Sequence, residues 1–217
     1  MTGGIHVKIC GLTSPADAHA SVALGADFLG INLHPQSPRY VPLARFRSMA
    51  AEFPDGPRVA VMVEPRRGDL PAVRDAGFGL FQVHFRHDIP LASIEEWSRE
   101  VGADALWLAP KLPPGIDVPA DWLGLAGCFL IDTFDKALFG GTGRTGDWPK
   151  FRRHREAHPD RTWILSGGLN PSNVGEAITG TGARFVDVTT GVESTPGTKD
   201  HAKLQAFFGA VRASASR

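Results

Sequence analysis

Short apolar runs rich in β-branched residues alternate along this chain with longer segments in which apolar residues recur every three or four positions. The first pattern is typical of buried strands, and the second is typical of amphipathic helices. Eight strand-like runs occur, at residues 5–10, 28–33, 58–63, 80–85, 105–109, 128–132, 162–166 and 185–189. Helices are predicted at residues 16–24, 72–76, 150–158, 173–178 and 199–212, with a weaker candidate at 119–126. Strands that alternate with helices in this way favour a parallel sheet covered by helices.

The number of strand–helix units favours a closed barrel. Eight units in 217 residues leave about 27 residues for each unit, which suits compact repeats. The sequence therefore predicts an α/β fold in which residues 1–217 form a single (β/α)8 TIM-barrel domain, with residues 213–217 frayed. An open, doubly wound sheet is the alternative, and the lack of a dinucleotide-binding fingerprint makes it less favoured.

The composition excludes several classes of protein. Lys and Arg total 23 and so do Asp and Glu, so a net charge of zero gives no electrostatic basis for binding nucleic acid. No apolar run approaches the roughly 18 residues of a membrane span, and the N-terminus lacks the features of a secretory signal. Two cysteines, Cys10 and Cys128, make no disulfide framework, so we expect a cytoplasmic protein in which Cys128 is a small core residue.

One basic stretch, at residues 150–155, lies in a predicted helix with acidic residues nearby. We interpret it as a solvated helix face. His154 and His158 stand four residues apart in the same segment and could clip a metal ion, but an exposed face is the favoured interpretation. We therefore expect no metal site.

Side chains alternate along a strand, so every second residue shares a face. The first strand then has Ile5, Val7 and Ile9 toward the helices and His6, Lys8 and Cys10 inside the barrel. The same rule turns further polar groups inward near the carboxyl ends of strands: Asn32, Gln82, His84, Asp132 and Asp187. Burying each group costs on the order of a few kcal/mol unless it is paired or used. A Lys8–Asp187 pair that only holds the core is one interpretation, but the whole set favours a functional site.

Glycine-rich loops follow the last three strand-like runs. Gly143 and Arg144 lie on the first of these loops, which we expect to close over a ligand. Backbone N–H groups beside glycine approach an anion closely, and barrels bind phosphate after their seventh and eighth strands. The predicted ligand is therefore a phosphorylated small molecule, held by Gly143, Gly167, Gly168, Gly191 and Val192.

More specific motifs occur in barrel order over nearly the whole chain. They are KICGLT at 8–13, GADFLG at 25–30, SPRYV at 37–41, QVH at 82–84, LIDT through GGTG at 130–143, DW at 147–148, SGGLNPSNV at 166–174, and VDVTTGVE with PG and KD at 186–200. In these motifs the sequence resembles the phosphoribosylanthranilate isomerase family of tryptophan biosynthesis.

The resemblance implies an Amadori rearrangement, which converts N-(5'-phosphoribosyl)anthranilate to 1-(2-carboxyphenylamino)-1-deoxyribulose 5-phosphate. By position, Asp132 matches the general acid of the family, Cys10 its general base and Arg39 its anthranilate-binding arginine. His84 and Asp187 match polar substrate-contacting positions of the family, and Lys8 completes the predicted substrate-binding set. The resemblance implies that the enzyme uses no cofactor or metal and that its partner is a phosphorylated small molecule. Either a monomer or a homodimer would fit.

The chemistry places demands on both catalytic groups. Asp132 must hold a proton at neutral pH to act as an acid, and we expect apolar neighbours to help it do so. Lys8, two residues before Cys10 on the same strand face, is the cation that we expect to favour the thiolate form of Cys10.

One departure from the family and two other functions stay open. Phe85 stands where the family commonly has glycine, so its ring either narrows the pocket or turns outward. The same rearrangement on an aminoimidazole carboxamide nucleotide, in histidine synthesis, uses two aspartates, and Cys10 in place of the first argues against it. A non-catalytic barrel that binds a phosphorylated metabolite or a protein is the remaining alternative.

Overall fold

Eight parallel strands close into a barrel in the computed structural model, which describes residues 2, 4–132 and 147–215. The strands are β1 His6–Ile9, β2 Phe28–Asn32, β3 Arg58–Val63, β4 Leu80–Arg86, β5 Leu106–Lys111, β6 Cys128–Ile131, β7 Thr162–Leu165 and β8 Phe185–Val188. Each strand pairs in parallel with the next, and β8 returns to β1 with Lys8 opposite Asp187. The predicted (β/α)8 barrel is confirmed, and the open sheet is wrong.

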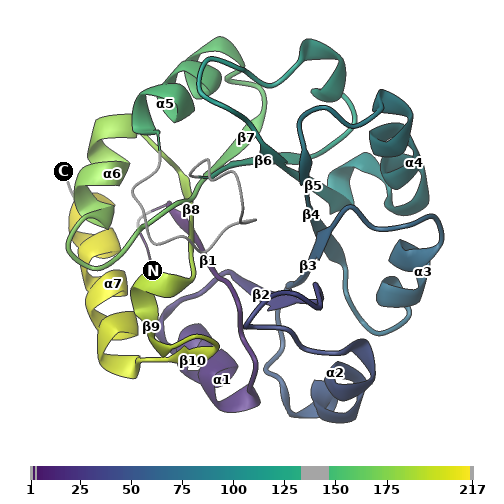
Figure 1. Cartoon of the computed structure of the whole chain (residues 1–217). Coiled ribbons are helices and arrows are strands. Elements are labelled where there is room, and N and C mark those ends of the chain that lie inside the picture. The colour runs from purple at the N-terminus through teal and green to yellow at the C-terminus, as the bar shows by residue number, and fades with distance from the viewer. Residues whose placement is uncertain (1, 3, 133–146, 216–217) are drawn as a thin grey trace.

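Helices form a ring around this barrel (Figure 1). They are α1 Pro15–Leu24, α2 Leu43–Met49, α3 Asp69–Arg74, α4 Leu91–Val101, α5 Trp148–Ala157, α6 Val174–Thr181 and α7 His201–Ala215. Helices α1 and α5 begin one and two residues before their predicted starts, each at a side-chain cap: the Ser14 hydroxyl accepts from the Asp17 N–H, and the Asp147 carboxylate accepts from the Lys150 N–H. A short hairpin, β9 Glu193–Thr195 and β10 Thr198–Lys199, lies between β8 and α7.

One prediction about a helix is wrong. The candidate at 119–126 is only a single 3-10 turn, Ala120–Trp122, because so short a segment with Gly124 inside it has little intrinsic helix stability. Helix α7 extends to Ala215 with buried side chains up to Val211, residues 216–217 lie outside the described residues, and the frayed end stays a prediction. Helices α2 and α4 were not singled out from the sequence.

Apolar side chains fill two layers, one between the barrel and the helices and one inside the barrel. Ile5, Val7 and Ile9 belong to the first layer, as their alternation predicts. Cys128 belongs to the second, where burial raises the pKa of its thiol to about 12. His6 lies at the edge of this inner layer with its side chain 60% exposed, and its ring centroid is 5.8 Å from that of Phe185.

Helix α5 differs from the exposed basic face that its sequence predicts. Lys150 and His154 are buried, whereas Arg152 and Arg153 are exposed. The Lys150 ammonium donates to the Pro113 carbonyl at 3.0 Å. Both ring nitrogens of His154 are also used, one with the Lys150 carbonyl at 2.8 Å and one with the Val118 N–H at 2.9 Å. The prediction was wrong for these two residues because segment 112–118 covers one side of the helix.

The second histidine of that pair, His158, lies just past the end of α5 and is half-buried. Its ring centroid is 6.3 Å from that of Trp163, so it packs against the core rather than on an exposed face.

Candidate functional site

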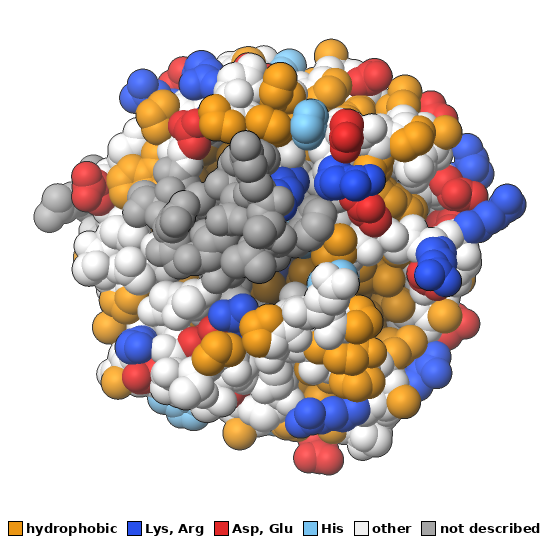
Figure 2. All heavy atoms as spheres, viewed as in Figure 1, with side chains coloured by type: hydrophobic (Ala, Val, Ile, Leu, Met, Phe, Trp, Pro, Cys, Tyr) orange, Lys and Arg blue, Asp and Glu red, His pale blue; other side chains and the backbone are white. Residues whose placement is uncertain are grey.

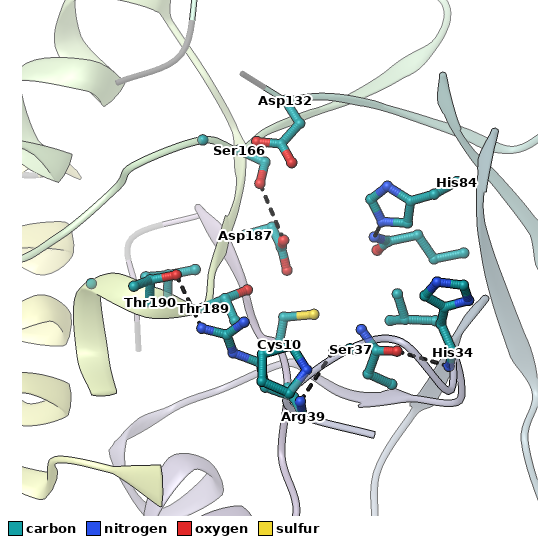
Figure 3. A pocket seen from close by; sticks show the side chains of 18 of the residues that line it. Cys10, His34, Ser37, Arg39, His84, Asp132, Ser166, Asp187, Thr189 and Thr190 are labelled. Carbon is teal, nitrogen blue, oxygen red and sulfur yellow. Dashed lines mark hydrogen bonds between the residues drawn. The ribbon is translucent and has the colours of Figure 1, made fainter. Parts of the chain in front are cut away.

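A pocket of about 240 Å³ lies at the carboxyl ends of the barrel strands (Figure 3). Most of the predicted site residues line it: Cys10, Arg39, His84, Asp132, Gly167, Gly168, Asp187 and Gly191. The pocket also takes Asn32 and Gln82, whose inward orientation the strand alternation predicts. The structure thus brings together residues from the ends of six strands.

Two predicted residues do not line the pocket, and the position of a third is not described. Lys8 is fully buried beneath it, and Gly30 on β2 makes space there, because a Cβ at Gly30 would come within 2.9 Å of the Lys8 ammonium. Val192 is also fully buried, and its N–H donates to the Thr189 carbonyl. Gly143, with its neighbour Arg144, lies outside the described residues.

Cys10 and Asp132 face each other across the pocket. Figure 3 shows the sulfur of Cys10 directed into the cavity from the end of β1, and Asp132 on the opposite side at the end of β6. A ligand that fills the pocket would therefore have one of these groups on each side.

A buried ion pair supports the base of the pocket next to Cys10. Lys8 Nζ donates to Asp187 Oδ1 at 2.7 Å, and Asp187 Oδ2 accepts from the Ser166 hydroxyl at 3.3 Å. Burial alone would lower the pKa of Lys8, but the charges of Asp187 and Cys10 outweigh it and hold that pKa above its ordinary value. Lys8 is thus a cation beside Cys10, and the Lys8–Asp187 pair that the alternation suggested is present.

Arg39 reaches the pocket from the segment after β2 and is held by a second buried cluster. Its Nε and Nη2 donate to the Glu193 carboxylate at 2.8 and 2.6 Å, a bidentate pair. Glu193 Oε1 also accepts from Lys199 Nζ at 3.0 Å, and the same ammonium donates to the Cys10 carbonyl at 2.6 Å. Gly11 allows this approach, because a Cβ there would lie 2.6 Å from Arg39 Cδ.

The charges of this cluster shift one another's ionisation. Burial alone would raise the pKa of Glu193, but the hydrogen bond from Arg39 and the charge of Lys199 hold it below its ordinary value. For Lys199 burial prevails, and its pKa lies below the ordinary lysine value. Neither residue was among the predicted site residues, although both stand in the final motif of the chain.

His84 projects into the pocket from β4 (Figure 3) and pairs with Gln82. The Gln82 Nε2 atom lies 2.7 Å from His84 Nε2. Burial, with smaller effects from Lys8 and His34, lowers the pKa of His84 to about 3. The imidazole is therefore neutral at physiological pH.

The next residue on β4, Phe85, stands where the family commonly has glycine, and its ring turns away from the pocket. Phe85 is fully buried on the outer side of the barrel, with its ring centroid 5.6 Å from that of Trp97 and 5.3 Å from that of Trp122. It does not line the pocket, so the outward interpretation is confirmed and the ring does not narrow the site.

The loops after β7 and β8 form a glycine-lined rim. Gly167 and Gly168 both have positive φ, 92° and 62°, a conformation that glycine adopts readily and other residues rarely do. A Cβ at Gly191 would collide with the Leu169 carbonyl and lie 2.9 Å from Asn170 Cα. The two loops can pack this closely only with glycine at 191.

Around this face, basic and acidic side chains are interspersed at the rim (Figure 2). Within the ranges that the structure describes, no three His, Cys, Asp or Glu side chains gather in a way that would hold a metal ion. Among the helices of those same ranges, none has the length and apolar character of a membrane span.

The fold and the pocket define a (β/α)8-barrel enzyme with its site at the carboxyl ends of the strands. The family model described as N-(5'phosphoribosyl)anthranilate (PRA) isomerase matches residues 7–210. The chain belongs to this isomerase family.

Curated relatives and solved structures agree with the family model. The N-(5'-phosphoribosyl)anthranilate isomerase of Granulibacter bethesdensis is 39% identical over 211 residues, covering 95% of this chain and 97% of the relative. That of Aquifex aeolicus is 35% identical over 207 residues, covering 94% and 97%. The crystal structure of phosphoribosyl anthranilate isomerase from Thermotoga maritima matches with a TM-score of 0.78 and 30% identity, covering 96% of this chain and 99% of that one. Another matches with a TM-score of 0.76 and 28% identity over 96% and 99%, and it holds reduced 1-(o-carboxyphenylamino)-1-deoxyribulose 5-phosphate.

Proposed function

We propose that this chain catalyses the Amadori rearrangement of N-(5'-phosphoribosyl)anthranilate to 1-(2-carboxyphenylamino)-1-deoxyribulose 5-phosphate, a step of tryptophan biosynthesis. One observation carries the proposal: a thiol and a carboxyl group, Cys10 and Asp132, face each other across one pocket in a member of this isomerase family. The reaction needs an acid and a base on the two sides of a sugar.

In the proposed mechanism Asp132 gives a proton to the furanose ring oxygen. The bond between that oxygen and C1' breaks, and the nitrogen lone pair forms an iminium. The thiolate of Cys10 then removes the proton from C2', and the electron pair of that C–H bond forms the enolamine, which tautomerises to the ketone. A general acid or base contributes about 100- to 10,000-fold to such a reaction.

Lys8 supports the basic role of Cys10, because its buried ammonium stabilises a negative sulfur. Replacing it tests this role without the substrate. We expect iodoacetamide to alkylate Cys10 more slowly at neutral pH in the Lys8→Met variant than in the wild type. Equal rates in the two folded proteins would contradict the role of Lys8.

The remaining pocket residues are proposed to bind the two ends of the substrate. Glu193 occupies the Nε and Nη2 side of Arg39, so that, as far as the described residues go, Nη1 is left for the anthranilate carboxylate. The N–H groups at Gly167, Gly168 and Gly191 would hold the phosphate, with Gly143 contributing from its loop. His84 and Asp187 contact the sugar, while Val192 supports the phosphate loop from the core.

The composition of the chain, together with this reaction, leads us to propose a cytoplasmic enzyme in which residues 1–217 act as one domain. Its partner is the phosphorylated substrate. A monomer and a homodimer both fit, since the site is built from side chains of one chain.

Turnover of freshly prepared phosphoribosylanthranilate, followed by its loss of fluorescence, tests the proposal. We expect fast decay with the wild type, a loss of at least about 100-fold in Cys10→Ser and Asp132→Asn, and unchanged decay in Cys128→Ala. Cys128 is a matched control because it lies in the inner apolar layer, outside the pocket.

Binding separates the remaining alternatives. A wild-type protein that binds the reduced product analogue without converting phosphoribosylanthranilate would be a binding protein and would refute the proposal. Turnover of the aminoimidazole carboxamide nucleotide instead would assign the chain to histidine synthesis.

A further inference from the structure

Gln82 is a buried pocket residue to which the proposed mechanism gives no role. Its side chain is 1% exposed and comes from β4, two residues before His84 on the same strand face. Its Nε2 atom lies 2.7 Å from His84 Nε2, a distance typical of a short hydrogen bond.

The chemistry of the two groups fixes the direction of this hydrogen bond. A carboxamide nitrogen carries hydrogens and no lone pair that can accept, so it acts only as a donor. His84 Nε2 must therefore accept, which requires a neutral ring with its proton on Nδ1. Burial and the positive charge of Lys8 act in the same direction, because both disfavour an imidazolium at this position.

The other end of the Gln82 amide indicates why this residue is present. Among the described residues, the buried Gln82 Oε1 has no hydrogen-bond partner. A buried oxygen without a partner destabilises a fold, so packing alone would be served better by methionine, which has a similar size and no such oxygen. The donor end of the amide is then the part of the side chain that has a use.

We propose that Gln82 is a positioning residue that holds His84 in its neutral Nδ1–H tautomer, so that the imidazole donates a hydrogen bond to an oxygen of the bound substrate. In this role His84 transfers no proton and serves as a fixed donor on the wall opposite Asp187 (Figure 3). The part of the inference that concerns substrate rests on the proposed function. The part that concerns the tautomer does not.

Nitrogen-15 NMR of the folded protein tests the tautomer directly. The chain has eight histidines, and the signals of His84 are those missing from the spectrum of His84→Asn. We expect a protonated Nδ1 and an unprotonated Nε2 in the wild type. In Gln82→Glu, a variant of nearly the same shape, the carboxylate accepts instead of donating and the proton should move to Nε2. A wild-type ring protonated on Nε2 would overturn the proposal.

A double-mutant cycle tests whether Gln82 acts through His84. We expect Gln82→Met to weaken binding of the reduced product analogue about tenfold and to lower kcat/KM by a similar factor, the effect of about one hydrogen bond. In the His84→Asn background the same substitution should change neither quantity further. Gln205→Met, on the exposed side of α7, is the matched control and should match the wild type in both.

The outcomes distinguish positioning from a merely structural role. Equal losses from Gln82→Met in both backgrounds, or no loss in either, would refute positioning. If the wild type binds the analogue but shows no turnover, the proposed function fails, and the tautomer and the binding cycle still decide the role of Gln82. Melting temperatures of Gln82→Met, His84→Asn and Gln205→Met, expected within a few degrees of the wild type, and a folded circular-dichroism spectrum of Gln82→Glu at the temperature of the NMR measurement show that each comparison is made on folded protein.

Discussion

Replacing Lys8 by methionine should destabilise the protein strongly, because it leaves a buried carboxylate without its cation. Lys8 is 0% exposed and the Asp187 side chain 5% exposed, and their charged atoms lie 2.7 Å apart. Methionine keeps the apolar stem of lysine, so the change removes the ammonium with little loss of volume. Only the Ser166 hydroxyl, 3.3 Å from Asp187 Oδ2, then remains as a described hydrogen-bond partner of that carboxylate.

The size of the effect follows from the burial of both groups. Breaking a buried ion pair by removing one partner costs about 3–5 kcal/mol, since the other charge stays desolvated. In a chain of 217 residues each kcal/mol shifts the melting temperature by about 2–4 °C. We therefore expect Lys8→Met to melt roughly 6–20 °C below the wild type. The double variant Lys8→Met/Asp187→Asn removes the unpaired charge and should recover most of that loss.

Urea unfolding at pH 7, followed by circular dichroism, measures both variants against the wild type. An exposed pair on α5 supplies the control: Arg152 Nε lies 3.9 Å from Glu156 Oε1, and both side chains are more than half exposed. Arg152→Met should change the free energy of unfolding by only a few tenths of a kcal/mol. A double variant no more stable than Lys8→Met would refute the reasoning, because the loss would then not come from the uncompensated charge of Asp187.

Three further predictions follow from single residues. Burial lowers the pKa of His84 to about 3 in the folded chain, against 6.5 ordinarily, so the unfolded state takes up the proton first and stability falls as the pH drops below about 6.5. Urea unfolding should therefore show an extra loss of about 2 kcal/mol between pH 7 and pH 5, and this loss should be absent in His84→Asn. Gly191→Ala should raise KM at least about tenfold, because the new methyl group displaces the phosphate loop from the Leu169 carbonyl, and an unchanged KM would contradict a phosphate role for this loop. The control Gly180→Ala has open space at its Cβ and should stabilise the protein by up to about 1 kcal/mol. Phe85→Ala should cost about 3–5 kcal/mol in thermal unfolding yet leave KM unchanged below the melting transition, and an altered KM would mean that the ring does reach the pocket.

The strand faces were predictable from the sequence because they depend only on local alternation. Once β1 and β4 are recognised as strands, Lys8 and Cys10 share one face, and so do Gln82 and His84. Barrel closure then brings these faces together without any further information. For this reason most of the predicted site residues line one pocket.

The errors arose where contacts between distant segments decide burial. The charge run on α5 has the composition of a surface helix, and only the covering segment 112–118 buries Lys150 and His154. Arg39 finds its partner Glu193 at a separation of 154 residues, which no local pattern reveals. Glu193 and Lys199 stand in the final motif, but polar residues in a hairpin are typical of solvent-exposed turns, so the motif did not reveal that both are buried.

The distant contacts that build the site meet at one place in the barrel, the seam where β1 pairs with β8. The Lys8–Asp187 hydrogen bond spans 179 residues and the bond from Lys199 to the Cys10 carbonyl spans 189, and both cross this seam. Cys10 has its two buried lysine neighbours only after the last strand and the hairpin behind it have closed the barrel. The same closure of the barrel brings Glu193 to Arg39. Arg39, proposed to hold the anthranilate carboxylate, and Cys10, proposed to remove the C2' proton, are therefore both positioned by the closure of the barrel. Closing the fold and assembling this half of the site are therefore the same step.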